Sequence, residues 1–133
     1  MKCFLLGILG ALLFLTVAAL IIPQYSDYTA RAETSKWFGQ LWPILADIEK
    51  NAIQQSSLMN AGRNVIVDKD AFQNLKVNLI EITETGMVIL RGGKEGQVII
   101  LIPSLDAEQV TWRCIGGPNR AVSPNCRTGD LLR

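Results

Sequence analysis

A run of residues without a single charged side chain, at positions 3–22, constrains this chain more than any other part of its sequence. As an α-helix, the run is about 30 Å long, which matches the hydrocarbon core of a bilayer. Lys2 is the only charged side chain before it, so the positive-inside bias predicts a cytoplasmic N-terminus and an exported remainder. We expect a membrane or assembly segment that includes Phe4, Leu5, Leu6, Leu12, Phe14, Leu20 and Ile22, with Pro23 ending or kinking the run.

A cleavable secretory signal is the alternative interpretation of this run. Lys2 then forms the basic start of the signal, and the small residues at 17–19 (Val-Ala-Ala) offer a cleavage site. Against this alternative, the apolar region is long for a signal, and cleavage after Ala19 leaves Leu20 and two isoleucines exposed. We therefore expect an anchor in the inner membrane and a periplasmic remainder, with a secreted periplasmic protein as the alternative.

A second helical stretch, residues 24–55, follows the apolar run. Its apolar residues recur at steps of three and four, as in an amphipathic helix. Pro43 is expected to bend the helix, because its missing N–H removes one helical hydrogen bond. We expect one long, curved helix in which Trp37, Phe38 and Trp42 pack against a sheet. The predicted stripe comprises Tyr28, Trp37, Leu41, Ile44, Leu45, Ile48 and Ala52.

Turn and cap residues replace the helical pattern over residues 56–73, which predicts a connecting loop with one short strand at 65–67. The acids Asp68 and Asp70, like residues 26–27 earlier, have no partner ligands at calcium-loop spacing. We interpret them as solvated turn residues.

Four short strands follow, and the turns between them predict antiparallel pairing of neighbours. In the first strand, alternation places Val77 and Leu79 on one face and Ile80 and Ile82 on the other. Gly86 supplies the positive φ of the first hairpin turn. The predicted strands are residues 76–82, 87–91, 97–102 and 110–114, with turns at 83–86 and 92–96 and a stop at 103–104.

These patterns predict an α+β fold, in which the long N-terminal helix crosses one face of a four-stranded antiparallel sheet. The chain then divides into the helix, residues 1–55, and a globular domain, residues 56–133. The apolar first half of the helix contains the membrane or assembly segment, residues 3–22.

The composition argues against catalysis. The sequence has no histidine and a net charge of +1, from 13 basic and 12 acidic side chains. The commonest general base and metal ligand is therefore missing, and the balanced charge gives no general attraction to nucleic acid. The glycine-rich residues 92–96 lack the spacing and the following Ser or Thr of a phosphate loop. We expect no enzyme activity, no cofactor and no metal site.

Cys114 and Cys126 enclose a segment with two glycines, two prolines and no hydrophobic period. In an oxidising compartment, a disulfide between them would hold this loop and contribute about 3 kcal/mol. A zinc site or a catalytic thiol is the alternative, but the chain offers neither a histidine nor a second cysteine pair. We predict the disulfide and a C-terminal loop that it closes.

Three segments, at residues 23–32, 110–117 and 123–127, together resemble the type IV pilins of Gram-negative bacteria. Residues 23–32 (Pro-Gln-Tyr-Ser-Asp-Tyr-Thr-Ala-Arg-Ala) are similar to the pilin helix at its exit from the membrane. Residues 110–117 (Val-Thr-Trp-Arg-Cys-Ile-Gly-Gly) and 123–127 (Ser-Pro-Asn-Cys-Arg) are similar to the last strand and the end of the disulfide-bounded loop. Residues 80–86 and 102–107 are similar to other parts of the pilin sheet.

The resemblance implies a structural or accessory subunit of a type IV pilus, with other pilin subunits and the pilus assembly machinery as partners. It implies a place in the inner membrane, in an extracellular pilus, or in both. One departure concerns assembly, since Leu6 stands near the register of the membrane-embedded glutamate of pilins and the prepilin cleavage motif is absent. We therefore expect a chain that does not form a homopolymer but remains in the membrane or enters a pilus sparsely.

A DNA-uptake receptor is the alternative function from a different class. Basic side chains gather late in the chain, with Arg113, Arg120 and Arg127 as the candidate DNA contacts, and Trp112 offers a ring for base stacking. A solvated edge with compensating acids such as Glu95 explains the same charges. We regard nucleic acid as the less favoured partner.

Overall fold

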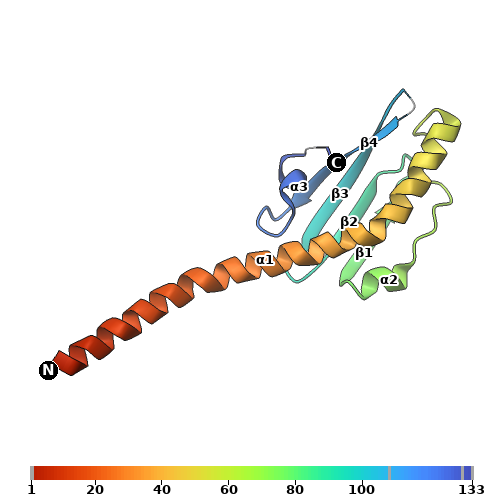
Figure 1. Cartoon of the computed structure of the whole chain (residues 1–133). Helices are drawn as coiled ribbons and strands as arrows, with labels where there is room; N and C mark the ends of the chain where they lie inside the picture. The colour runs from red at the N-terminus through yellow and green to blue at the C-terminus, as the bar shows by residue number, and fades with distance from the viewer. Residues whose placement is uncertain (1, 108, 130, 133) are drawn as a thin grey trace.

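The computed structural model describes residues 2–107, 109–129 and 131–132, with side chains from residue 7 onward. Helix α1 (Lys2–Gln55) runs without a break through Pro23 and Pro43 and curves along its length (Figure 1). Its N-terminal half extends away from the rest of the molecule, and its C-terminal half lies along the sheet (Figure 1). The predicted α+β fold, with one long helix and one four-stranded sheet, is confirmed.

The sheet is an antiparallel meander in which neighbouring strands pair in chain order. Its strands are β1 (Val77–Ile82), β2 (Val88–Gly92), β3 (Gln97–Asp106) and β4 (Gln109–Gly117). Gly86 has the predicted positive φ, 82°, in the turn between β1 and β2. Gly93 and Gly96 have φ values of 71° and 66° in the turn between β2 and β3, a backbone region that favours glycine.

A single hydrophobic core joins the C-terminal half of α1 to one face of this sheet. The helix contributes a stripe of residues three and four positions apart, and the strands contribute every second residue. These spacings follow from the period of about 3.6 residues in a helix and of two in a strand. The buried residues include Trp37, Leu41, Ile44, Leu45, Ile48 and Ala52 from α1, and Val88, Leu90, Ile99, Leu101, Val110 and Trp112 from the sheet.

One predicted member of the helical stripe, Tyr28, and one member of the predicted aromatic cluster, Trp42, are not buried. Tyr28 is 67% exposed, because it lies before the point at which α1 reaches the core, and Trp42 is 56% exposed on a neighbouring helix face. Trp37 is fully buried and Phe38 packs against the core, so the aromatic cluster is divided between core and surface.

The first strand contains a bulge that the alternation pattern did not reveal. Val77 pairs with Gly92 and Leu79 with Arg91, so one extra residue, Asn78, stands in β1. Because a bulge reverses the faces of the residues that follow, Val77 is buried whereas Leu79 is 45% exposed. The prediction that these two side chains share a face is wrong.

The predicted end of the third strand is also wrong, since β3 continues through Pro103 to Asp106. The pairing of β2 with β3 ends at Leu101 of β3. Pro103 therefore lies in the part of β3 that has only β4 as its neighbour. A proline is tolerated at such an edge because one side of the strand needs no N–H donor.

The connecting loop differs from prediction in two places. Residues 65–67 form no strand, and Ile66 is 87% exposed. The short helix α2 (Lys69–Gln73) follows, because the Asp68 carboxylate accepts hydrogen bonds from the backbone N–H groups of Asp70 and Ala71. Asp68 is exposed, as expected, and it also serves as the N-cap of α2.

Candidate functional site

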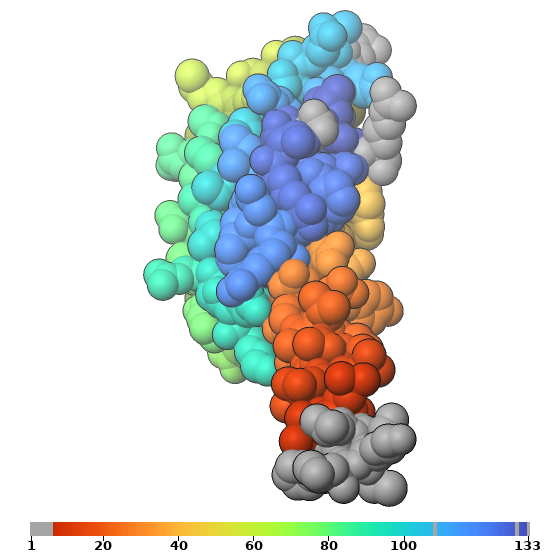
Figure 2. Space-filling model, turned by 90° about the vertical axis from the view of Figure 1, so that its left-hand side faces the viewer, coloured from red at the N-terminus to blue at the C-terminus, as the bar shows by residue number. Residues whose placement is uncertain are grey.

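The described side chains of the apolar segment (residues 3–22) lie outside the core of the folded domain. From residue 7 to residue 22 every side chain but that of Ala18 is exposed, including Leu12 at 56%, Phe14 at 73% and Leu20 at 69%. The space-filling view shows this part of α1 projecting beyond the domain (Figure 2). A stretch of this size in water exposes far more contiguous apolar surface than soluble monomers tolerate.

The hydropathy of the same segment is that of a membrane-spanning helix. Its most apolar window has a mean hydropathy of 2.1 and no buried residue, and it is the one such helix among the described residues. Length and composition therefore fit a bilayer, and a secretory signal near the N-terminus meets the same criteria. The structure therefore shows an exposed apolar helix that is long enough to be a membrane anchor or a signal sequence. Phe4, Leu5 and Leu6 lie outside the residues whose side chains are described.

A polar junction fastens α1 to the domain just beyond the apolar segment. Lys76 Nζ lies 2.8 Å from Glu33 Oε1, and the Lys94 backbone N–H donates to Glu33 Oε2 at 3.2 Å. Ser26 Oγ donates to Glu95 Oε1 at 3.3 Å, and Arg120 Nε lies 3.0 Å from Glu95 Oε2. The contacts of Ser26 with Glu95 and of Glu33 with Lys94 join the helix to the turn between β2 and β3. The contacts of Lys76 and Arg120 add the residue before β1 and the segment after β4.

The hydrogen bond from Lys76 holds the pKa of Glu33 below its ordinary value, and the Lys94 N–H and the Lys76 charge act in the same direction. Partial burial opposes them by disfavouring the charged form. Glu33 is therefore a carboxylate at neutral pH, fixed between the helix and the sheet.

Ser26, Glu33 and Glu95 were not predicted as functional residues. Ser26 is a helical residue with a partner 69 positions away, not a solvated turn residue. A single sequence gives no signal for polar contacts over such separations, because no periodicity links the two partners.

The predicted disulfide between Cys114 and Cys126 is confirmed. It closes a segment that is more ordered than expected, since Ala121 and Val122 are fully buried and the short helix α3 (Pro124–Thr128) follows them. The Thr34 hydroxyl of α1 donates to the Ala121 carbonyl oxygen at 3.3 Å. The disulfide therefore fixes a lobe that covers part of the helix.

The candidate DNA contacts have structural roles in this lobe. Arg113 Nε donates to the Gly129 carbonyl oxygen at 3.2 Å, and Arg127 donates through Nε and a terminal nitrogen to the Val122 carbonyl oxygen. Arg120 forms its ion pair with the predicted compensating acid, Glu95. Arg113 and Arg127 hold parts of the C-terminal segment together, and Arg120 joins that segment to the turn between β2 and β3.

Trp112 does not offer a ring for base stacking, which corrects the expectation drawn from its sequence neighbours. The side chain is only 5% exposed, and its Nε1–H donates to Glu49 Oε1 of α1 at 2.6 Å. Strand alternation turns it toward the core, opposite to the neighbouring Arg113.

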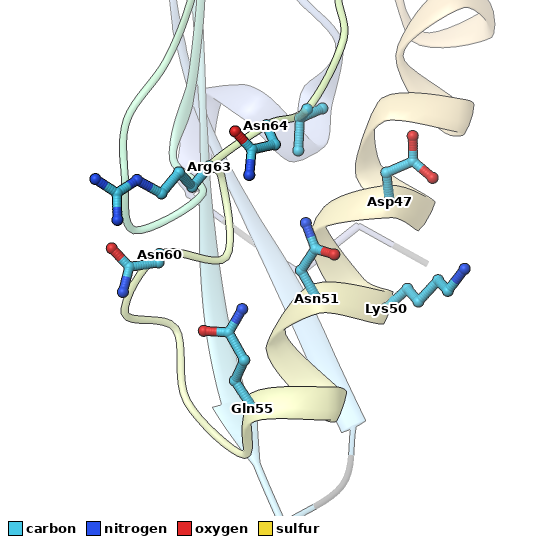
Figure 3. A pocket seen from close by; sticks show the side chains of 8 residues that line it. Asp47, Lys50, Asn51, Gln55, Asn60, Arg63 and Asn64 are labelled. Atoms are coloured by element: carbon cyan, nitrogen blue, oxygen red, sulfur yellow. The ribbon is translucent and has the colours of Figure 1, made fainter.

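A polar hollow of about 520 Å³ lies between the end of α1 and the turns that follow it (Figure 3). Asn51 extends into the gap and donates through Nδ2 to the Ala61 carbonyl oxygen at 3.0 Å, so its amide serves the fold. Arg63 and Lys50 point to opposite sides and away from the centre (Figure 3). The lining residues are Asp47, Lys50, Asn51, Gln55, Asn60, Arg63, Asn64 and Val65. The charged groups diverge, so the hollow presents no convergent set of catalytic side chains.

A second depression, of about 510 Å³, is more apolar and lies where α1 faces β4 and the C-terminal residues. Trp42, Ile53 and Leu131 surround it, each between 45% and 56% exposed. Among the described residues, no group of three or more His, Cys, Asp or Glu side chains is placed to hold a metal ion.

Comparison with protein-family models, with curated proteins and with solved structures finds no match to this chain.

Proposed function

We propose that the chain is a membrane-anchored structural subunit of the pilin type, whose apolar segment lies in the inner membrane or among the helices of a pilus. The domain that begins near Asp27 is displayed outside the hydrocarbon. The observation that carries this proposal is the unpartnered apolar segment, which belongs to the same uninterrupted helix as the buried core stripe.

Continuity of the helix makes the segment more than a passive anchor. Helix α1 enters the core with six buried side chains between Trp37 and Ala52, so a force on the apolar segment is transmitted directly to the domain. An assembly subunit needs this rigid connection, whereas a signal that is cleaved after Ala19 does not. The partners in this proposal are other pilin subunits and the assembly machinery.

A photo-reactive amino acid placed at Leu12 or Phe14 tests the proposal in cells that express the full chain. Ile66, exposed on the domain, is the matched control position. We expect crosslinks to other protein chains from positions 12 and 14 and none from position 66. Recovery of the chain without residues 1–19 in the aqueous periplasmic fraction contradicts the proposal. If positions 12 and 14 crosslink only to lipid, the membrane anchor is supported but the assembly role is contradicted.

A further inference from the structure

Two exposed tyrosines follow the apolar segment directly. Tyr25 is 68% and Tyr28 is 67% exposed. With a helical rise of about 1.5 Å per residue, they lie roughly 5 and 9 Å beyond Ile22. Helical side chains lean toward the N-terminus, which brings both rings back toward the apolar segment. Tyrosine is enriched at this depth because its ring is apolar and its hydroxyl is polar.

The folded domain begins at the same level. Among the described residues, Ser26 is the first along α1 that is hydrogen-bonded to the domain, through Glu95. Ser26 lies about 6 Å beyond Ile22 along the helix, within a headgroup layer of about 5–8 Å on each side of a bilayer. The turns at residues 93–96 and 118–120, which the ion pair of Arg120 and Glu95 joins, therefore lie beside the headgroups.

At the edge of the domain next to the apolar segment, the acidic side chains are largely covered and the basic side chains are exposed. The acidic side chains Glu33 and Glu95 are 23% and 17% exposed and face the junction with the helix. Arg120 is 66% exposed, and Arg31 and Lys94 are exposed as well. Asp27 is the half-buried acid nearby, and Lys76, 67% exposed, adds a further cation. The outward-facing charge is thus mainly positive, although the whole chain is close to neutral.

We propose that this membrane-facing rim (Tyr25, Tyr28, Arg31, Lys94 and Arg120) docks on the phospholipid headgroups of the outer leaflet of the membrane that holds the apolar segment. Arg31, Lys94 and Arg120 bind lipid phosphate groups, and the two tyrosines lie between the headgroups and the acyl chains. This inference rests on the proposed membrane anchor, and it adds a fixed orientation of the domain on the lipid surface.

The test uses the full chain with Cys3→Ser and Asn119→Cys, labelled with an environment-sensitive fluorophore at position 119, which is exposed and adjacent to Arg120 of the rim. The chain is reconstituted in vesicles of phosphatidylethanolamine and phosphatidylglycerol that contain a headgroup-attached nitroxide lipid. We expect loss of most of the fluorescence at position 119. Ile66→Cys is the control and is expected to keep its fluorescence. Ile66 lies in the loop beside Pro43 and Asp47 of α1, away from the apolar segment.

Lys94→Gln keeps the backbone hydrogen bond to Glu33 and removes one outward charge. It is expected to lower the docking equilibrium about fivefold, since each basic residue at an anionic surface contributes on this scale. Lys50→Gln, at the distant end of α1, is expected to leave docking unchanged. A chain that resists carbonate extraction but shows no quenching at position 119 overturns the docking inference and leaves the anchor intact. A chain that is not retained in the vesicles overturns both.

Discussion

Glu33 is the residue whose chemistry bears most directly on how the helix meets the sheet. Its pKa is lowered in the folded chain, so its contribution to stability is present above the unfolded pKa of about 4.3 and is lost as the pH falls through the folded pKa. Lys76, its partner, is 67% exposed, and solvent screening keeps the pair at the scale of a surface salt bridge.

Glu33→Gln is therefore expected to lower the free energy of unfolding by about 0.5 kcal/mol at pH 7. The difference from wild type shrinks as the pH falls below the unfolded pKa of about 4.3, and it disappears once the pH lies below the lowered folded pKa, where the wild-type carboxylate is protonated. Denaturant unfolding of the full chain in detergent at both pH values measures it. Glu81→Gln, on the exposed face of β1, is the control. A difference that is equally large at low pH contradicts an ionic origin.

Gly62 illustrates a second residue-scale constraint. A Cβ at this position would collide with the Thr83 carbonyl oxygen and would lie 2.9 Å from Ile82 Cγ2. Both neighbours belong to the end of β1 and its turn, so the backbone must move to admit the methyl group.

Gly62→Ala is expected to destabilise the chain by about 2 kcal/mol through this overpacking. Gly39→Ala, on the exposed face of α1 with open space around it, is expected to stabilise by about 1 kcal/mol through helix propensity. Thermal unfolding of the two variants compares them directly. Equal effects of the two substitutions would show that the close approach at Gly62 is not a constraint.

At the scale of elements, the disulfide and the lobe that it closes depend on each other. The two cysteines are separated by 12 positions in the sequence, and Cys126 belongs to α3, whereas Cys114 belongs to β4. The lobe adds few side chains to the core, chiefly Val122, and we expect the covalent bond to supply much of what holds the segment in place.

Alkylation of the oxidised chain is expected to label Cys3 alone, because it is the one cysteine outside the disulfide. Replacing both Cys114 and Cys126 by serine is expected to cost about 3 kcal/mol of unfolding free energy. Mass spectrometry counts the labels, and calorimetry measures the stability. Ready labelling of all three thiols without reductant contradicts the pairing.

The elements differ in how far the sequence could predict them, for physical reasons. The helix and the strand pattern were predictable because burial on one face imposes a period on the chain. The bulge at Asn78, the extension of β3 through Pro103 and the short helix α2 were not, since each depends on a neighbouring strand or cap. In the candidate site, the apolar segment and the disulfide were predictable, whereas the ion pairs of Glu33 and Glu95 join residues far apart in the chain.

At the scale of the whole molecule, we expect the apolar segment to determine whether the chain is soluble in water and monomeric. The domain has one continuous core and, among its described residues, no buried side-chain nitrogen or oxygen atom without a hydrogen-bond partner. A truncated chain that begins at Asp27 is expected to be soluble and monomeric, and the full chain to require detergent. Analytical ultracentrifugation of both in the same buffer tests this. Aggregation of the truncated chain would show that the domain itself exposes an unpartnered surface, with the Trp42 and Leu131 depression as its first candidate.

The central claim is that the apolar segment is retained and holds the domain at a membrane. Intact-mass measurement of the chain from separated membrane and periplasmic fractions tests this claim most directly. The account predicts that the chain is in the membrane fraction, resists carbonate extraction and still contains the whole of residues 7–22. A soluble periplasmic chain that begins at Leu20 would contradict it.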